Sequence, residues 1–352
     1  MAAFTTIDDP SAHFQTATYT GNANYNTITN DGNSNLGPDL IWGKCRSTSK
    51  LHYWYDTSRG TEKRIESDNT GAEDSNTNGV LNFYTDGFRV GSGNTENDNG
   101  ETYVAWQWKA NGGTTTSFSE SGNNPGGARQ TNTDAGFSII TYTGTGANAS
   151  CALAHGLPST PEMIFFKRRN ADQVWATWHQ GIGDDYKLEL NGTGGKDADG
   201  AFMNSTLPDS TNIYVGGTSV NTNADNGTYV CYAFSPVQGY SKFGSYVGNG
   251  DANGSFVYTG FKPAMIILKR TDATNNWLIY DHKRSGYNPK QDKLYPDDAS
   301  AEDASTTSVD LLSNGFKLRA SSASQNASGG TYIYMAFAEN PFVANGKPTT
   351  AR

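Results

Sequence analysis

The sequence lacks long apolar runs and an obvious targeting segment. Its apolar stretches, such as 163–166 and 264–268, are about five residues long, far below the roughly 18 that a membrane helix needs. The first ten residues contain neither the basic region nor the apolar region of a secretory signal. We therefore expect a chain that does not insert into a membrane.

Cysteine is also scarce, with only Cys45, Cys151 and Cys231 in 352 residues. An odd, small number of cysteines argues against a disulfide framework and for synthesis in a reducing cytosol. Cys45 and Cys231 lie inside apolar segments and are expected to be small buried hydrophobic residues.

Charged residues are few, and basic residues are the minority among them. There are 26 Lys and Arg against 35 Asp and Glu, a net charge of -9. Without a basic face to neutralise phosphates, nucleic acid is not an expected partner. A charged fraction of 17% also excludes coiled coils and helical bundles, and an aromatic fraction of 12% argues against disorder.

What the sequence has in abundance is glycine and aromatic residues: 40 Gly, 19 Tyr, 16 Phe and 7 Trp. Aromatic and Thr residues separated by Gly, Asn and Asp are typical of strands joined by tight turns. No run of ten or more residues shows a helical period. The composition predicts an all-β protein.

The chain repeats itself three times. An apolar segment follows a proline and ends in a basic residue, at PDLIWGK from Pro38, PEMIFFK from Pro161 and PAMIILK from Pro263. A tyrosine-containing segment recurs 65 residues after the first proline, at Tyr103. It recurs 68 residues after the second and 69 after the third, at Tyr229 and Tyr332. This constant spacing indicates three copies of one fold.

Further segments fall in the same order in each copy. They are the upstream TYTGN, TYTGT and SYVGN segments, and the aromatic segments HYWYD, VWATWH and NWLIYD. YTDGFRVG corresponds to LSNGFKLR, whereas the second copy has only the degenerate NIYVGG. In the segment from Thr228 to Phe234 both alternating faces are apolar, which predicts a central strand covered on both sides.

Copies of roughly 100 residues made of short strands favour β-sandwiches, each large enough for its own core. We predict three tandem β-sandwich domains of jelly-roll type. The predicted organisation is an N-terminal anchoring segment 1–15, repeat 1 at 16–112, a flexible linker or extended arm at 113–135, repeat 2 at 136–239, repeat 3 at 240–342 and a tail 343–352. Repeats 2 and 3 are expected to form a stiff pair, with repeat 1 held more loosely, because only the first joint is long and glycine-rich.

The recurring segments, together with DPSAHFQTATYTGN from Asp9, resemble a poorly characterised repeat domain. It is encoded in the structural-gene regions of tailed phages, many of them marine phages and cyanophages. The resemblance covers about Asp9 to Phe342. It implies concanavalin-like or laminin-G-like sandwiches in a non-enzymatic virion protein made in the host cytoplasm and exposed on the virion surface.

The resemblance further implies a tail-fibre or adsorption role, with a capsid decoration or head fibre as the alternative and a polysaccharide-degrading tailspike as a less favoured one. The implied partners are other virion proteins, a host receptor or glycan, and further copies of the chain, with a trimer suggested by analogy.

The sequence predicts no catalytic residue and no metal ligand. The histidines, His13, His52, His155, His179 and His282, are scattered over the copies. The acidic pairs at 184–185, 297–298 and 302–303 lie in polar, loop-like stretches and are expected on a solvated surface. The segments 94–100, 196–200 and 221–227 offer oxygen ligands for calcium, but they also fit Asn-Gly and Asp-Gly turns, which we favour.

Sugar binding stays open, because tyrosine rings can stack on sugars. Candidate exposed rings are Tyr25, Tyr84, Tyr186, Tyr287 and Tyr295. No single binding residue is predicted.

Overall fold

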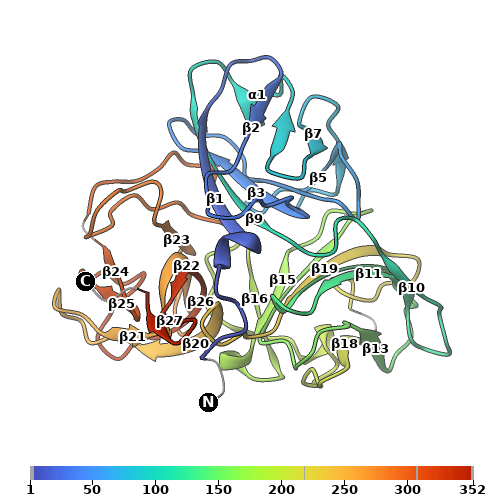
Figure 1. Ribbon diagram of the computed structural model, residues 1–352. Helices are drawn as coiled ribbons and strands as arrows, with labels where there is room; N and C mark the ends of the chain where they lie inside the picture. The colour runs from blue at the N-terminus through green and yellow to red at the C-terminus, as the bar shows by residue number, and fades with distance from the viewer. Residues whose placement is uncertain (1–3, 218, 307, 350–352) are drawn as a thin grey trace.

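The computed structural model describes residues 4–217, 219–306 and 308–349 and is all-β. Its strands form three units arranged around a common centre (Figure 1). The first unit starts at Phe14 rather than at residue 16, because the first strand already begins there.

Each unit contains an antiparallel inner sheet built from the recurring sequence segments. The order in unit 1 is β1 (Phe14–Thr20), β9 (Thr102–Trp108), β3 (Leu40–Cys45) and β4 (Tyr53–Asp56). In unit 3 it is β20 (Ser241–Val247), β26 (Thr331–Pro341), β22 (Phe261–Arg270) and β23 (Leu278–Asp281). The eight-stranded sheet of unit 2 runs β10 (Thr116–Phe118), β11 (Gly126–Asn132), β12 (Phe137–Thr143), β19 (Thr228–Phe234), β14 (Met163–Arg168), β15 (Ala176–His179), β16 (Tyr186–Glu189) and β17 (Asp197–Ala198).

A smaller outer sheet belongs to each unit. Its strands are β2 (Asn26–Ile28), β8 (Phe88–Val90) and β7 (Val80–Phe83) in unit 1, β13 (Ser150–Ala154) and β18 (Asn212–Gly216) in unit 2, and β21 (Phe256–Tyr258), β25 (Gly315–Leu318) and β24 (Val309–Leu312) in unit 3. The degenerate NIYVGG segment of the second copy forms β18, which pairs with β13. Among the described residues it has no hairpin partner of the kind that β7 and β24 provide in the other units.

The remaining elements are short. Two pairs of two-residue strands are antiparallel, β5 (Lys63–Arg64) with β6 (Asp74–Ser75) and β27 (Val343–Ala344) with β28 (Lys347–Pro348). The helical segments are α1 (Asn94–Asn97) and three 3-10 turns at Pro10–Ala12, Gln180–Ile182 and Gly200–Phe202. In the described residues, no helix has the length and apolar character needed to cross a membrane.

The two faces of each inner sheet are buried against different partners. In β3, Ile41 packs in the outer core of unit 1, whereas its neighbour Trp42 packs in a central core that draws on all three units. The same holds in β22 for Ile266 and Ile267. The prediction of a central strand covered on both faces is confirmed for β19, which lies between β12 and β14 and buries residues 229–234 completely.

An aromatic triad occupies the middle of the central core. Trp108, Phe234 and Phe337 come from equivalent positions of β9, β19 and β26. Their ring centroids are 6.2 Å, 5.5 Å and 5.8 Å apart. Each unit therefore contributes one ring to a shared contact, of the kind that adds stability beyond buried area alone.

This shared core corrects the expectation of separate domains with a loosely held first repeat. Trp54 of unit 1 contacts Trp175 and Tyr232 of unit 2, at centroid distances of 5.0 Å and 5.2 Å. Phe14 of unit 1 stacks on Phe337 of unit 3 at 5.2 Å. Unit 1 is thus packed against both neighbours. The inner sheets use apolar residues on two faces because one of those faces belongs to the common core.

The segment 113–135 is folded rather than a flexible linker, which corrects a second expectation. β11 pairs with β12 over seven residues, and β10 pairs with β11. At its start, the carboxylate of Asp39 accepts backbone hydrogen bonds from Ala110, Gly112 and Gly113. These bonds fix the beginning of the segment to unit 1.

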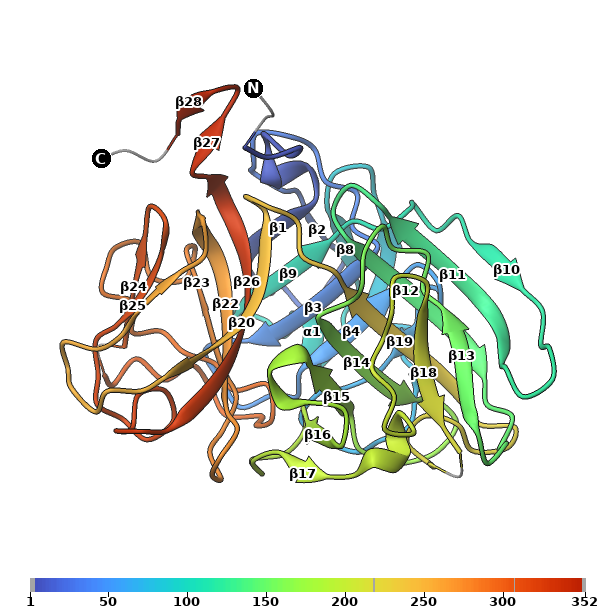
Figure 2. The same ribbon diagram turned by 90° about the horizontal axis from the view of Figure 1, so that it is seen from below.

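The two terminal segments lie together at one end of the molecule, as Figure 2 shows. Phe4 packs edge-on against Phe342, with centroids 6.4 Å apart, and Asp8 accepts a hydrogen bond from the backbone of Asn345. Ile7 is buried in the central core. The described parts of the predicted anchoring segment and tail are therefore docked on the units.

Candidate functional site

Three equivalent lysines connect the units, because each donates a hydrogen bond from one unit to the next and the three contacts together form a closed ring. Lys167 of unit 2 donates to the carbonyl of Thr70 in unit 1, at 3.1 Å. Lys269 of unit 3 donates to Thr193 of unit 2 at 2.8 Å, and Lys44 of unit 1 donates to Ala299 of unit 3 at 3.1 Å. All three lysines are buried, and this burial lowers the pKa of each to about 8.

Two of the three junctions between units also contain a buried ionic network. At the junction of units 1 and 2, Arg59 bonds to Asp56 at 2.5 Å and to Glu73 at 3.1 Å. Glu73 also binds Arg169, and Tyr232 donates to Asp56 at 2.7 Å. The junction of units 3 and 1 repeats this arrangement with Arg284, Asp281, Glu302, Arg46 and the indole of Trp106.

The junction of units 2 and 3 lacks this network in the described part of the chain. His179 replaces the aspartate and Ile182 the arginine. The hydroxyl or indole donor is replaced by Met335. His179 Nε2 lies 3.2 Å from the carbonyl of Tyr334, and its Nδ1 accepts the backbone N–H of Gly181. Burial lowers the pKa of His179 to about 4, so His179 itself is neutral at pH 7.

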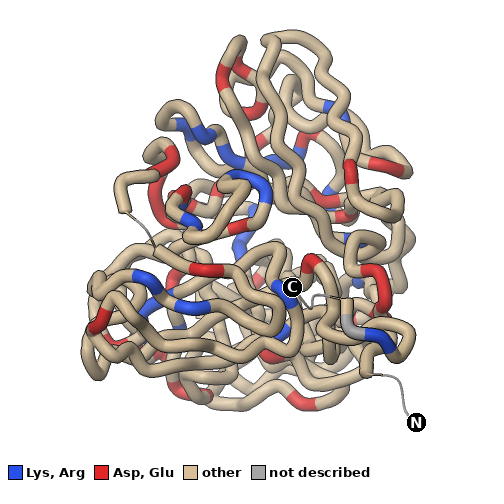
Figure 3. Tube along the Cα trace, turned by 60° about the vertical axis from the view of Figure 1, so that its left-hand side comes forward, with Lys and Arg blue, Asp and Glu red and all other residues tan. Residues whose placement is uncertain are grey.

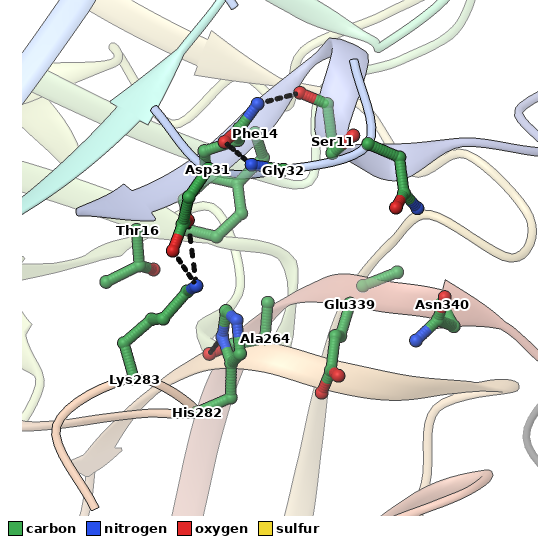
Figure 4. Close-up of a pocket in the computed structure, with 13 residues that line it drawn as sticks. Ser11, Phe14, Thr16, Asp31, Gly32, Ala264, His282, Lys283, Glu339 and Asn340 are labelled. Carbon is green, nitrogen blue, oxygen red and sulfur yellow. Dashed lines mark hydrogen bonds and ion pairs between the residues drawn. The ribbon is translucent and has the colours of Figure 1, made fainter. Parts of the chain in front are cut away.

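A cavity of about 270 Å³ lies at the junction of units 3 and 1 (Figure 4). Its floor is made of the buried residues Phe14, Ala264 and Ala338. Gln15 braces the unit 1 wall, because its amide donates to Ser11 and accepts from the backbone of Gly32. The remaining lining residues are Thr16, Asp31, Asn33, His282, Lys283, Glu339 and Asn340.

The ionisable groups of the cavity come from both units. Lys283 reaches from unit 3 to Asp31 of unit 1, with both carboxylate oxygens 2.8 Å from the ammonium (Figure 4). This pair is largely exposed and is worth little in stability. His282 Nδ1 lies 3.1 Å from the carbonyl of Ala264, so Nδ1 carries the proton and Nε2 is left as an acceptor. Burial lowers the pKa of His282, which keeps it neutral at pH 7.

At the junction of units 1 and 2, the position equivalent to the cavity is filled by β11. There Gln130 of β11 donates to Thr57 and Ser58, at 2.7 Å and 2.6 Å. Thr57 and Ser58 are equivalent to His282 and Lys283, as the matching strands β4 and β23 show. β11 therefore occupies one junction, and the corresponding space beside β1 is open.

Chemically, the cavity suits a small ligand with several donors. It offers the imidazole nitrogen of His282, the carboxylate of Glu339 and the amides of Asn33 and Asn340 around an apolar floor. Glu339 is also paired with Lys262 at 2.8 Å. At the floor, Thr16 replaces the Ile139 and Phe243 of the other units, and its buried hydroxyl has no hydrogen-bond partner among the described residues.

The structure places the five histidines apart. His52, His155 and His179 are buried and bonded to backbone carbonyls. His13 contacts the amide of Asn132 at 3.1 Å. In the part of the chain that the structure describes, His282 is the one histidine that lines the cavity. None of the five lies within hydrogen-bond distance of a described cysteine or serine side chain.

Several of the acidic pair residues, and one of the calcium candidates, have structural partners. Glu302 belongs to the ionic network, Asp303 binds Lys293 and Tyr295, and Asp297 is largely buried. The expectation of a solvated surface is therefore wrong for Asp297 and Glu302. In the segment 94–100 the buried Glu96 accepts from Tyr55. No group of three or more His, Cys, Asp or Glu able to hold a metal is found within residues 4–217, 219–306 and 308–349.

The candidate sugar-stacking tyrosines are dispersed. Tyr25 and Tyr287 are well exposed, at 65% and 89%, and Tyr84 is at the margin with 37%. Tyr186 and Tyr295 are half-buried. Arg89 covers one face of Tyr25 and Lys196 one face of Tyr186, which leaves less ring surface for a sugar. The predicted burial of Cys45 and Cys231 is confirmed, Cys151 is buried as well, and all three cysteines are free.

Sequence reasoning missed the junction residues and the cavity. The recurrence of Lys44, Lys167 and Lys269 after three apolar strands was a usable signal, because a lysine is rarely fully buried without several hydrogen-bond partners. The alignment of the copies also shows His179 in the position of Asp56 and Asp281. That Met335 accompanies His179 could not be seen, because the two residues belong to different units that meet only in the folded chain.

Comparison with known proteins gives one match. No curated protein and no solved structure matches the chain. One family matches over residues 9–341, so that a single family domain spans all three units. Its extent agrees with the common core, which makes the three copies one folded body. The chain therefore belongs to the family described as a domain of unknown function, DUF7483.

Proposed function

We propose that this protein is a non-enzymatic structural component of a tailed-phage particle, with a tail-fibre or adsorption role at the virion surface. We also propose that each of the three units is a jelly roll of concanavalin-like or laminin-G-like type. Other virion proteins are the partners at one end of the molecule, and a host receptor or glycan is the partner elsewhere.

The observation that carries the proposal is the threefold repetition of one unit around a common core. A body of this kind presents three similar sets of loops at each end, which fits an element mounted on a threefold-symmetric particle component. The resemblance of the recurring segments to phage structural proteins supplies the biological context. This step is an analogy of fold and family rather than of site chemistry.

Two further observations support the proposal. The terminal segments dock at one end, next to the cavity beside β1, which gives that end a defined surface for attachment. In the view of Figure 3, most basic positions have acidic positions near them along the trace, and the whole chain has a net charge of -9. A net negative charge of this size does not favour nucleic acid as a partner.

A capsid decoration or head fibre is the second candidate, because a compact body with its termini at one end suits mounting on a shell equally well. Imaging of intact particles by cryo-electron microscopy, with a density tag fused to the chain, distinguishes the two. We expect the tag on the tail. A tag on the head would replace the adsorption role by decoration, and absence from purified particles would overturn both.

Enzymatic activity is tested separately. We expect that incubating the purified protein with host envelope polysaccharide releases no new reducing ends. Release by the wild type that is lost in a folded His282→Leu variant would instead assign a polysaccharide-degrading tailspike.

A further inference from the structure

The outer edges of the three inner sheets are occupied differently. β1, β12 and β20 are equivalent, because each pairs along its length with the central strand β9, β19 or β26. β12 carries β11 on its other side. β1 is bordered by the loop around Gly32 and by the Lys283–Asp31 bridge. In the described part of the chain β20 has no strand on its outer side.

Backbone groups of β20 point outward at this edge. The carbonyl of Phe243 accepts from the side chain of Gln180 at 2.8 Å, and that of Val247 accepts from Ser255 at 3.0 Å. Both carbonyls therefore point away from β26. Since alternate residues of an antiparallel strand face the same neighbour, the N–H and C=O of Ser245 also face outward. Ser245 is exposed, so these groups are free to pair with another strand.

Apolar side chains gather at the same edge. Val247, Phe256 and Tyr258 are 58%, 46% and 50% exposed. β21, which carries Phe256 and Tyr258, is the edge strand of the outer sheet of unit 3. Lys242 of β20 donates to the carbonyl of Tyr258 at 2.8 Å, which places both sheet edges side by side. Clustered exposed apolar residues beside unpaired strand groups are typical of an interaction surface.

A groove of about 330 Å³ lies beside this edge, and the side chain of Lys196 gives it a positive charge. It is lined by Gly181, Lys196, Ser245 and Val247 among others. Lys196 stacks on Tyr186 and has no ion-pair partner among the described residues. It occupies the position that Glu73 and Glu302 hold at the other two junctions, where they pair with arginines. The groove is therefore complementary to an acidic strand.

The chain itself contains a strand with an acidic residue beside it. β10 is the outermost strand of the unit 2 sheet and, among the described residues, pairs with β11 alone. It is followed by Glu120, which is exposed and forms no ion pair in the part of the chain that the structure describes. Pairing of β20 with β20 of another copy would instead bring Lys196 and Lys242 of both copies together, which like charges disfavour.

We propose that β10 of one copy adds to β20 of the next copy, with Glu120 reaching Lys196. The contact is head-to-tail, because it joins two different surfaces. It therefore builds a closed ring if the rotation between copies closes, and a chain of copies if it does not. This inference does not depend on the proposed virion role.

Sedimentation velocity of the whole protein, from about 1 μM to about 300 μM, measures the contact. We expect association that increases with concentration. Ser245→Pro removes an outward N–H that the fold does not use, and we expect at least about a tenfold weaker association. Ser245→Ala, which keeps that N–H, is the control and should associate like the wild type.

Charge reversal gives a second test that does not rely on proline. Glu120→Lys and Lys196→Glu should each weaken association, and the double variant should recover it, because both residues are exposed and the reversed pair is again complementary. A wild type that stays monomeric at the highest concentration would overturn the proposal. So would equal association of Ser245→Pro and Ser245→Ala, or a double variant as weak as the single ones.

Discussion

Asp68, Asn191 and Asp297 hold one structural position in the three units, with different chemistry. Each side chain accepts the backbone N–H of the residue directly before β4, β15 or β23, namely His52, Trp175 or Trp277. Burial raises the pKa of Asp68 and of Asp297 to about 7, against a usual 3.8. Asn191 makes the same hydrogen bond without a charge.

We predict that Asp68→Asn stabilises the protein at pH 8 by about 1–2 kcal/mol. The folded-state pKa of Asp68 lies above its unfolded value, so its contribution to stability is present below about pH 4 and is lost as pH rises through about 7. The gain from Asn should therefore shrink as the pH falls from 7 to 4. Chemical denaturation across this range measures it. The reciprocal Asn191→Asp should destabilise at pH 8, and a pH-independent difference would contradict the explanation.

The buried junction lysines are the second residue-scale feature. The ammonium of Lys167 donates to the carbonyls of Thr70, Arg168 and Gln173. We predict that Lys167→Met lowers the free energy of unfolding by about 2–4 kcal/mol, because buried carbonyls lose their donor. Lys109→Met, at an exposed site, is the matched control. Urea unfolding compares them, and equal stabilities would rule out a structural role for the lysine.

At the scale of elements, the β10–β11 hairpin distinguishes unit 2 from its neighbours. Gly127 permits the close approach of β11 to β12, because a Cβ at this position would lie 2.1 Å from the carbonyl oxygen of Thr141 and 2.9 Å from Tyr142. The hairpin therefore depends on glycine at a strand position, where glycine is otherwise unfavourable.

We predict that Gly127→Val detaches the hairpin while the three inner sheets stay folded. Hydrogen exchange should then rise by at least about tenfold in residues 116–132, with little change in the central strands. Ala128→Val, on the neighbouring residue, is the control and should leave exchange near wild type. Uniformly faster exchange in β19 would show that the hairpin is instead part of the global fold.

The positions of the strands along the chain were predictable from sequence, whereas the contacts between units were not. Pro38, Pro161 and Pro263 with the tyrosines downstream located β3, β14, β22 and their partners, because local pattern and turn residues decide where strands lie. The segment 113–135 was misread as a linker since its glycines and threonines suit both a tether and a close-packed edge strand. The cavity could not be predicted, because its two walls come from residues about 250 positions apart.

At the scale of the whole molecule, the ring of three units should behave as one cooperative body. The aromatic triad and the junction lysines connect every unit to both neighbours. We predict a single transition in scanning calorimetry, with equal calorimetric and van't Hoff enthalpies. Two or more resolved transitions would show that the units unfold independently.

The junction of units 2 and 3, where His179, Ile182 and Met335 replace the ionic network, supplies a design for the other two junctions. Arg59→Ile leaves Asp56 buried without its partner and should cost about 3–5 kcal/mol. Adding Asp56→His and Tyr232→Met copies the His179, Ile182 and Met335 arrangement, and we predict that it restores at least half of that loss. Guanidinium unfolding of the single and triple variants measures the recovery. A triple variant no more stable than Arg59→Ile would mean that the two junctions are not interchangeable.

The presence of all three junctions on one polypeptide has an evolutionary consequence. In a symmetric trimer of identical chains, any substitution appears at every corner at once. Here a substitution alters a single junction, so that one junction carries the β10–β11 hairpin, another the cavity and the third the His179, Ile182 and Met335 arrangement beside the open edge of β20. A chain that carries all three repeats can therefore change one junction while the other two preserve the fold.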